Sequence, residues 1–448
     1  SSSVVPMKRF GLYTAAGVLI AYMVTILFLP ALLKVTGTKR VFRENGGKLY
    51  MKLADWLDQL TLFNRKYYRQ IVAVSLIATI AIGMGMTKLR VNGYVFDDIG
   101  KSSVLIEDAN FFSEKLAPPF PLEIMIDTGE EYGITDPQLL LKLQKVEHFL
   151  NQYDEVKKIT TFNTLIQEIH AVMDPENAEM NPIPNDPDLV AQYLLLLEFN
   201  ENDLLDDVTD FNYQKYRVAT QTLDAGSIRI SEIRDELEVF LNEQFPDKEI
   251  QITGSTILSA DLVGKIVYSL ASSIGLAFIA ISIIMAFLFK EFKLVIISLI
   301  PNILPLVVIA GFMGYFGVDI KPSSAVIFTI AFGIAVDDTI HYLARLKVEL
   351  QRGYTLADAL QITTQKTGRA IIITSMILVA GFGSLISSAF SSTMLMGILV
   401  CGTILTALIA DLILLPALFY LSHPSEIKDE PRTEGVQESE HESQLETA

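Results

Sequence analysis

The hydrophobic residues of this chain gather in long uncharged runs, separated by stretches rich in charged residues. Apolar runs of roughly 17–25 residues are candidates for membrane-spanning helices, because the ~30 Å hydrocarbon core takes about 20 helical residues. Such runs occupy Gly11–Leu33, Ile71–Thr87, Ile266–Phe289, Leu294–Val318 and Ala370–Ala410. The last run is too long for one helix and contains a serine-rich break at 387–393, so it predicts two spans.

A further apolar run, Pro322–Val336, ends at two adjacent acids, Asp337 and Asp338. Its 15 residues cover only about 22 Å as a helix, so the span must continue to about Ala344. The sequence therefore predicts seven spans, with both acids buried at membrane depth. A charged side chain there costs about 2.5–3.5 kcal/mol or more, which makes the acid pair a candidate functional site.

The net charge of −17 is distributed unevenly along the chain. Between Val91 and Lys265 there are 34 acidic and 12 basic residues, whereas Lys34–Gln70 holds nine basic and three acidic residues. The positive-inside rule places the basic linker in the cytoplasm and the acidic segment outside, in the periplasm of a Gram-negative bacterium. The single cysteine, Cys401, lies within a span, so an intrachain disulfide is excluded.

The first and last spans resemble each other. A shift of 386 residues aligns Gly11 with Gly397 and the first Leu-Pro-Ala-Leu motif, at 29–32, with the second, at 415–418. Parallel repeats of this kind are common in transporters. We expect this chain to be the C-terminal portion of a longer protein of about twelve spans, whose first repeat is missing here except for its last helix.

The acidic segment alternates between strand and helix patterns. Alternating or β-rich stretches at 121–128, 156–162, 213–223 and 249–253 predict strands, and apolar residues at helical spacing predict helices over 136–153, 189–198 and 227–245. Two β-α-β units separated by an insertion favour a ferredoxin-like α+β domain. The sequence shows no cluster of metal ligands and no arrangement of catalytic residues, so we do not expect an enzyme.

Two further residues are candidates beside the acid pair. Asp411 lies about as far from the cytoplasmic end of its span as Asp337 does, and it could extend a path for protons. His341 shares a helix face with the pair and could relay protons, although an interfacial histidine is the simpler interpretation. Neighbouring carboxylates titrate as a unit, so we expect the two acids to gain and lose protons together.

Several motifs together resemble the resistance-nodulation-division (RND) superfamily, in particular its MMPL/Patched/Dispatched-type exporters with a sterol-sensing-domain architecture. The stretch Gly333-Ile334-Ala335-Val336-Asp337-Asp338 matches the signature Gly-x-x-x-Asp-Asp of that superfamily. The Pro301-Asn302-Ile303-Leu304-Pro305 stretch, the glycine-rich stretch 381–385 and both Leu-Pro-Ala-Leu motifs support the match. The layout of one span, a large external domain and five spans agrees with it as well.

The resemblance implies export of lipid-like or other hydrophobic molecules across a bacterial inner membrane, driven by the proton motive force. Asp337 and Asp338 would titrate, with protons as the coupling ion and no cofactor or metal. The expected partners are a hydrophobic substrate, the membrane, the missing N-terminal half and a homo-oligomer, and no nucleic acid. Two alternatives stay open: a sterol-sensing-type lipid receptor or scaffold without transport, and a Sec-type accessory subunit of protein export.

These observations predict an α-helical polytopic membrane protein with a ferredoxin-like periplasmic domain. The expected organisation is a last helix of the first repeat (1–33), a cytoplasmic linker with an amphipathic helix (34–70), the opening helix of the second repeat (71–88), a periplasmic porter-like domain (89–265), a five-helix bundle (266–421) and a disordered acidic cytoplasmic tail (422–448).

Overall fold

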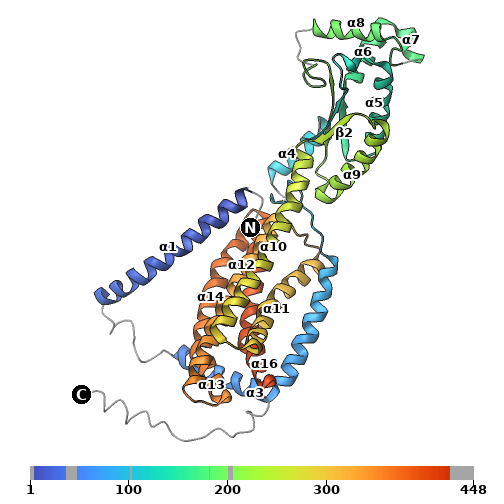
Figure 1. Ribbon diagram of the computed structural model, residues 1–448. Helices are drawn as coiled ribbons and strands as arrows, with labels where there is room; N and C mark the ends of the chain where they lie inside the picture. Colours follow the sequence, from blue (N-terminus) through green and yellow to red (C-terminus); the bar gives the residue numbers. More distant parts are fainter. Residues whose placement is uncertain (1–4, 37–47, 101–102, 181, 200–204, 424–448) are drawn as a thin grey trace, which may run out of the picture.

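The computed structural model describes residues 5–36, 48–100, 103–180, 182–199 and 205–423, which form a helical bundle with a smaller α+β domain at one end (Figure 1). Within these residues, seven helical stretches are long and apolar enough to cross a membrane. They are Lys8–Val35, Met51–Lys88, Ser255–Phe289, Phe292–Phe316, Pro322–Gln351, Leu356–Ser387 and Ser391–Ser422. The predicted seven spans are confirmed, and the chain is that of a multi-pass membrane protein. From residue 424 onward the predicted acidic tail lies outside the described residues.

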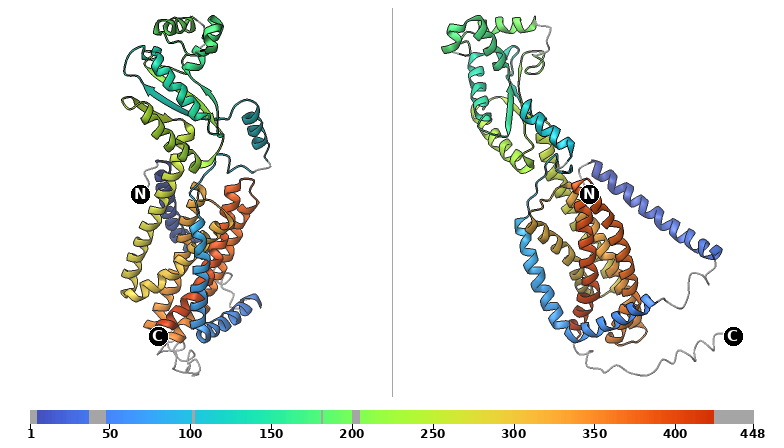
Figure 2. Two further views of the ribbon diagram at one scale, coloured as in Figure 1. Left: turned by 90° about the vertical axis from the view of Figure 1, so that its right-hand side faces the viewer. Right: turned by 180° about the vertical axis from the view of Figure 1, so that it is seen from behind.

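Several long helices of the bundle extend beyond the predicted apolar runs. They are α1 (Val5–Thr36), α3 (Lys48–Gly83), α10 (Ser255–Phe289), α11 (Phe292–Phe316), α12 (Pro322–Gln351), α14 (Arg369–Gly383) and α15 (Ser391–Ile409). Shorter pieces complete it: α13 (Leu356–Thr363), α16 (Leu415–Ser422), the 3₁₀ helices η1 (Met84–Lys88) and η4 (Ser384–Ser387), and the π-helices η3 (Thr364–Gly368) and η5 (Ala410–Leu414). Helix α1 stands apart from the other helices in both Figure 1 and Figure 2, and its apolar window buries no residue.

Helix α3 joins two elements that the sequence separates. The amphipathic helix expected within the linker 34–70 and the span expected from Ile71 form one continuous helix, with a break in the helical dihedral angles only at Tyr67. The part before the break still has one buried face, because its buried residues recur every three or four positions. That face consists of Leu57, Thr61 and Asn64.

The connection 346–368 between α12 and α14 contains more than one helical piece. Its first six residues continue α12, and α13 and η3 follow after a turn. Leu346, Leu356 and Leu360 are all buried in a hydrophobic cluster with α16 and the end of α12. The apolar side of the connection therefore packs against the bundle itself, and the bundle is thicker at this end than predicted.

Glycines bring α11 into direct contact with the end of α3. A Cβ on Gly314 would lie 1.8 Å from the Gly85 carbonyl oxygen, and a Cβ on Gly311 would lie 2.1 Å from the carbonyl oxygen of Ile82. Both distances are below any permitted contact, so these positions accept only glycine at the present helix separation. Small residues at helix interfaces let membrane helices approach in this way.

The external domain contains a four-stranded antiparallel sheet in the order β2-β3-β1-β4. The strands are β1 (Phe120–Asp127), β2 (Val156–Thr160), β3 (Lys215–Thr222) and β4 (Glu249–Thr253), each within two residues of the predicted bounds. Every second residue of β1 and β3 is buried, as expected for a sheet with one covered face. The predicted small sheet is thus confirmed.

Helices cover one face of this sheet and build the domain core. They are α5 (Pro137–Leu150) and α9 (Gly226–Gln244), and the insertion between the two β-α-β units adds α6 (Phe162–Met173), α7 (Pro175–Met180) and α8 (Pro187–Glu198). A short helix, α4 (Val104–Lys115), and the 3₁₀ turn η2 (Gly133–Thr135) complete the domain. Helix α10 starts directly after β4 and continues without interruption into the bundle (Figure 1), so the two parts share a continuous helix.

Candidate functional site

Helix α12 carries the acid pair in its middle. Pro322 occupies its first turn, where a missing N–H costs no helical hydrogen bond, and the helix then continues to Gln351. Successive helical residues point about 100° apart, so the two acids face different surroundings. Asp338 is 8% exposed, whereas the side chain of Asp337 is 72% exposed on the surface of this chain. The expectation of a buried pair therefore agrees with the structure for Asp338 only.

Asp411 joins Asp338 in the interior of the bundle, at the site where α12, α11 and the end of α15 meet. Asp411 is 1% exposed, and its Oδ1 accepts a hydrogen bond of 2.6 Å from the Thr339 hydroxyl. Its other oxygen, Oδ2, has no hydrogen-bond partner among the described residues. The charge of Asp338 also acts on Asp411. Asp338 and Asp411 are thus both buried in the bundle, and Thr339, the residue after Asp338, bonds directly to Asp411.

Thr339 has a second acceptor within reach. Its Oγ1 lies 2.9 Å from Oδ1 of Asn302 on α11. The Asn302 amide nitrogen donates to the Ser298 carbonyl at 2.8 Å, which turns the amide oxygen toward Thr339. Because a hydroxyl has only one proton, Thr339 can donate to Asp411 or to Asn302 but not to both.

The backbone around Asp411 is irregular. Asp411 lies in the π-helix η5, and the second π-helix, η3, approaches α12 through a 2.8 Å contact between the hydroxyls of Tyr342 and Thr364. π-Helical turns inside α-helices are frequent at functional sites. Thr339 and Tyr342 are site residues that the sequence patterns did not indicate. Tyr342 stands one helical turn after Asp338, and that spacing was the available signal.

His341 pairs with the exposed acid rather than with the buried ones. Its Nε2 lies 3.5 Å from Oδ1 of Asp337, and the side chain is 69% exposed. Both residues belong to a row of exposed small or polar positions that recur every three or four residues on α12. The row, called here the open face of α12, consists of Thr329, Gly333, Asp337, His341 and Ala344.

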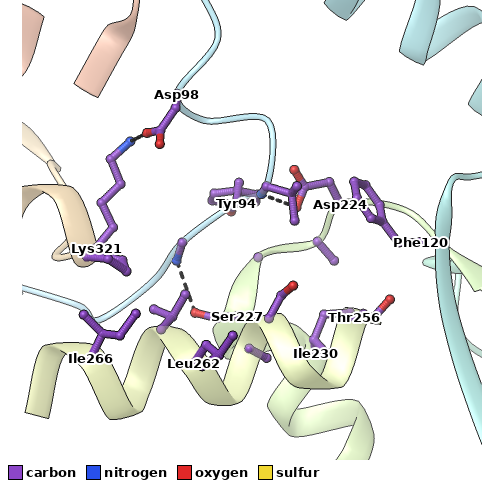
Figure 3. Close-up of a pocket in the computed structure, with 18 of the residues that line it drawn as sticks. Tyr94, Asp98, Phe120, Asp224, Ser227, Ile230, Thr256, Leu262, Ile266 and Lys321 are labelled. Carbon is purple, nitrogen blue, oxygen red and sulfur yellow. Dashed lines mark hydrogen bonds and ion pairs between the residues drawn. The ribbon is translucent and has the colours of Figure 1, made fainter. Parts of the chain in front are cut away.

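A polar network joins the outer end of α12 to the segment that follows η1. Lys321, the N-cap residue of α12, is buried and its Nζ lies 3.2 Å from Asp97 Oδ2 and 3.1 Å from Asp98 Oδ1 (the latter pair is drawn in Figure 3). Ser392, at the start of α15, donates its hydroxyl to Asp98. Burial alone would raise the pKa of Asp98, but the Ser392 hydroxyl and the Lys321 charge together hold it below its ordinary value.

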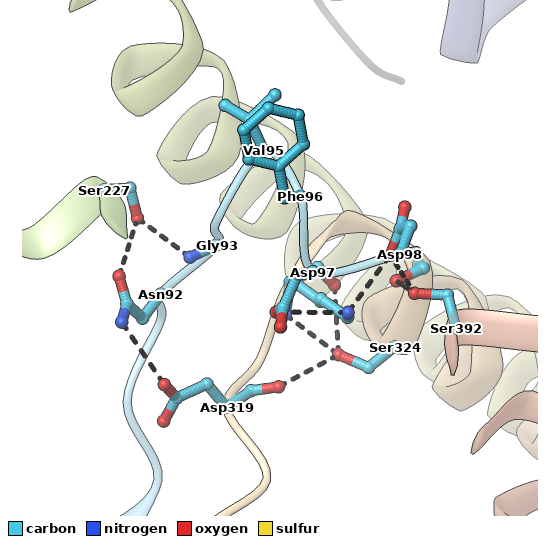
Figure 4. Close-up of polar contacts among 12 residues, drawn as sticks. Asn92, Gly93, Val95, Phe96, Asp97, Asp98, Ser227, Asp319, Ser324 and Ser392 are labelled. Carbon is cyan, nitrogen blue, oxygen red and sulfur yellow. Dashed lines mark hydrogen bonds and ion pairs between the residues drawn. The ribbon is translucent and has the colours of Figure 1, made fainter. Parts of the chain in front are cut away.

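The same segment is held by the external domain from its other side. The carboxylate of Asp224, between β3 and α9, accepts the backbone N–H groups of Val95 and Phe96 at 3.1 and 2.9 Å. Ser227, in the first turn of α9, donates to Asn92 Oδ1 and accepts from the Gly93 N–H (Figure 4). Residues 92–98, called here the junction segment, are thus bonded to the external domain and to two helices of the bundle.

The junction segment also borders a cavity of about 290 Å³ between the two parts of the chain (Figure 3). Phe120, Ile230, Leu262 and Ile266 contribute apolar surface, while Asp224 and Lys321 contribute charges of opposite sign. A cavity of this size and mixed character suits part of an amphipathic molecule. Within the described residues, no group of three or more His, Cys, Asp or Glu side chains could hold a metal ion.

Comparison with known proteins agrees with this architecture. Residues 216–436 match the model of the MMPL family. Over 295 residues the chain is 24% identical to a protein of Methanocaldococcus jannaschii described as a membrane protein, covering 64% of this chain and 72% of that relative. Over 200 residues it is 26% identical to the trehalose monomycolate exporter MmpL3 of Mycolicibacterium smegmatis, covering 40% of this chain and 20% of the exporter.

Proposed function

Since the chain, through residues 216–436, belongs to the MMPL family, as its motifs predicted, we propose that the protein is a secondary transporter that exports lipid-like or other hydrophobic molecules with the proton motive force. The observation that carries the proposal is the buried site formed by Asp338, Asp411, Thr339 and Asn302. Carboxylates at membrane depth are expensive and mark ion or proton pathways. MmpL3, the relative named as an exporter of trehalose monomycolate, supports the lipid-like substrate class.

The geometry of Thr339 offers a way to couple protonation to helix contacts. When Asp411 is ionised it can only accept, so the Thr339 hydroxyl donates to it. When Asp411 is protonated it can itself donate to the Thr339 oxygen, and the Thr339 hydroxyl is then free to donate to Asn302. Each protonation event would thus reverse the direction of the bond between α12 and η5 and add a hydrogen bond between α12 and α11.

The junction segment supplies a path from this site to the external domain. A shift of α12 along its axis would move Lys321, and with it the junction segment that Asp224 and Ser227 attach to the external domain. We propose that the external domain lies in the periplasm, because its acidic charge contrasts with the basic linker. The strand order β2-β3-β1-β4 supports the ferredoxin-like class for it.

The open face of α12 needs a cover within the membrane. An exposed Asp337–His341 pair facing lipid would be costly, whereas small and polar residues are suited to helix packing. We propose that a second membrane bundle covers this face, either a first repeat or a second copy of the chain. Gly333→Cys in a Cys401→Ser background would be cross-linked in membranes. If a second copy covers the face, the cross-linked product has twice the mass. If a first repeat covers it, the cysteine forms an internal link to a partner cysteine introduced there. The absence of both products would contradict this part of the proposal.

Transport can be tested in proteoliposomes containing the full-length protein and the lipid that co-purifies with it, identified by mass spectrometry. Asp338→Asn and Asp411→Asn should each abolish lipid transfer driven by a pH gradient, while lipid binding persists. Glu291→Gln, in the turn before α11, serves as a matched control for loss of a carboxylate. Unchanged transfer in both aspartate variants would refute proton coupling through this site. Lipid binding without any transfer in the wild-type protein would favour the receptor alternative.

A further inference from the structure

Helix η5 carries a backbone defect immediately beside Asp411. In a regular α-helix the carbonyl of residue 412 would accept the N–H of residue 416. Residue 416 is proline, which has no N–H. The Leu412 carbonyl therefore cannot accept the α-helical bond from residue 416, in a part of the bundle where Leu412 itself is 3% exposed. In a membrane such a freed carbonyl must be satisfied by a neighbouring helix, a side chain or water.

Asn64 supplies the missing donor. Its amide nitrogen lies 2.7 Å from the Leu412 carbonyl oxygen, across 348 residues of sequence. Asn64 is fully buried, and it lies on the face of α3 that also buries Leu57 and Thr61. The same part of α3 reaches the second π-helix, because Asp58 accepts a hydrogen bond from the Gln365 side chain. The amphipathic part of α3 thus contacts both π-helices that border the acid site.

We propose that Asn64 is a positioning residue for Asp411, and that the amphipathic part of α3 sets the protonation behaviour of the acid site through the Leu412 carbonyl. The inference rests on the proposed function, since it assigns a role within the proton site. The titratable groups that act on Asp411 are Asp338 and Tyr342 of α12. The adjoining faces of α11 and α3 contribute Asn302 and Asn64, which do not titrate, and the charged residues of α3 nearby are Asp58, which bonds to Gln365, and Arg65, which lies near Tyr420. A change at Asn64 therefore alters the placement of Asp411 and not its charged neighbours.

The arrangement allows a test in which a second substitution removes the need for Asn64. Asn64→Leu keeps the approximate volume but cannot donate. Pro416→Ala restores an N–H that can satisfy the Leu412 carbonyl within the helix. The readout is the pH titration of the Asp411 carboxyl band, recorded by infrared difference spectroscopy on the full-length protein in membranes and identified by its loss in Asp411→Asn. This measurement needs no substrate and no transport.

The expected result is that Asn64→Leu moves the titration midpoint by about one pH unit, and that adding Pro416→Ala removes most of the shift. Thr61→Val is the control, because the Thr61 hydroxyl bonds to the Leu57 carbonyl of its own helix and should leave the midpoint unchanged. If Asn64→Leu alone does not fold, the proposal requires that Asn64→Leu combined with Pro416→Ala does fold. A wild-type midpoint in Asn64→Leu, an equal shift with and without Pro416→Ala, or an Asp411 band that does not titrate would each overturn the proposal. Failure of the proposed function appears separately, as transport that survives in Asp338→Asn and Asp411→Asn.

Discussion

Replacing Lys321 by methionine should loosen the junction segment by a moderate and calculable amount. The ammonium group is buried, but its two partners are not: the side chains of Asp97 and Asp98 are 42% and 56% exposed. An ion pair with an exposed partner is worth about 0.2–1 kcal/mol, and two such pairs to one buried cation give about 1–2 kcal/mol. Methionine fills most of the volume of the lysine stem, and both carboxylates can be hydrated after the change. The cost should therefore stay below the ~3–5 kcal/mol expected when a buried charge loses its partner.

Hydrogen exchange of the backbone, measured by mass spectrometry on a peptide covering residues 91–98, checks this value. A loss of 1–2 kcal/mol should reduce protection of the segment about 5- to 30-fold, while peptides from the sheet of the external domain keep theirs. Lys265→Met, at an exposed position of α10, controls for the change in charge. Unchanged protection would mean that Lys321 contributes nothing to the attachment. A loss of several hundred-fold would mean that the carboxylates cannot be hydrated.

The pKa of Asp98 determines how the attachment of the junction segment to the bundle depends on pH. The pKa of Asp98 is lowered below its ordinary value of 3.8, so the folded state holds the ionised form more tightly than the unfolded chain does. The stabilisation that ionised Asp98 gives to the folded state is complete above its ordinary pKa. It is lost as the pH falls through the lowered pKa of the folded state. Protection of the junction segment, corrected for intrinsic exchange rates, should therefore stay constant between pH 7 and 5. A decrease within that range would show that another group controls the attachment.

Three further predictions concern single positions. Thr339→Val removes the hydroxyl that donates to Asp411, and a hydrogen bond to a charged group is worth about 1.5–3 kcal/mol. The substitution should therefore move the pH optimum of transport by about one to two units. Thr339→Ser keeps the hydroxyl and should stay close to wild type. Gly314→Ala should lower the melting temperature in detergent because overpacking costs about 1–3 kcal/mol, whereas Gly264→Ala, with no atom within 4 Å of the new Cβ, should not. Burial raises the pKa of Glu147 despite the hydrogen bond from Thr161. The contribution of Glu147 to the stability of the folded domain therefore declines as the pH rises above 4.5. Glu147→Gln should raise the melting temperature at pH 7 but not at pH 4.

The spans and the sheet could be predicted because each depends on a pattern that is visible along the sequence. Membrane thickness fixes the length of an apolar run, and alternation fixes a half-buried strand such as Phe120–Asp127. Asp338 and Asp411 could also be nominated from sequence, since an acid in an apolar run is costly wherever it points. The direction of each side chain could not, because α12 has apolar residues on all sides and only its neighbours decide which face is buried. The four-residue spacing of Gly333, Asp337 and His341 was the one signal that set Asp337 apart.

The polar partners of the acids were harder to predict, yet they follow a rule that the structure makes visible. Asn302 lies between Pro301 and Pro305, and Asp411 lies five residues before Pro416. Each proline removes one backbone N–H and so leaves a carbonyl without its helical donor. Polar side chains and irregular helical turns are tolerated beside such carbonyls because they satisfy them, as Asn64 does for Leu412. The same groups can then serve an ionisable neighbour. In this chain, the prolines of α11 and of the last span thus lie within about two turns of Asn302 and Asp411, the polar residues of the acid site.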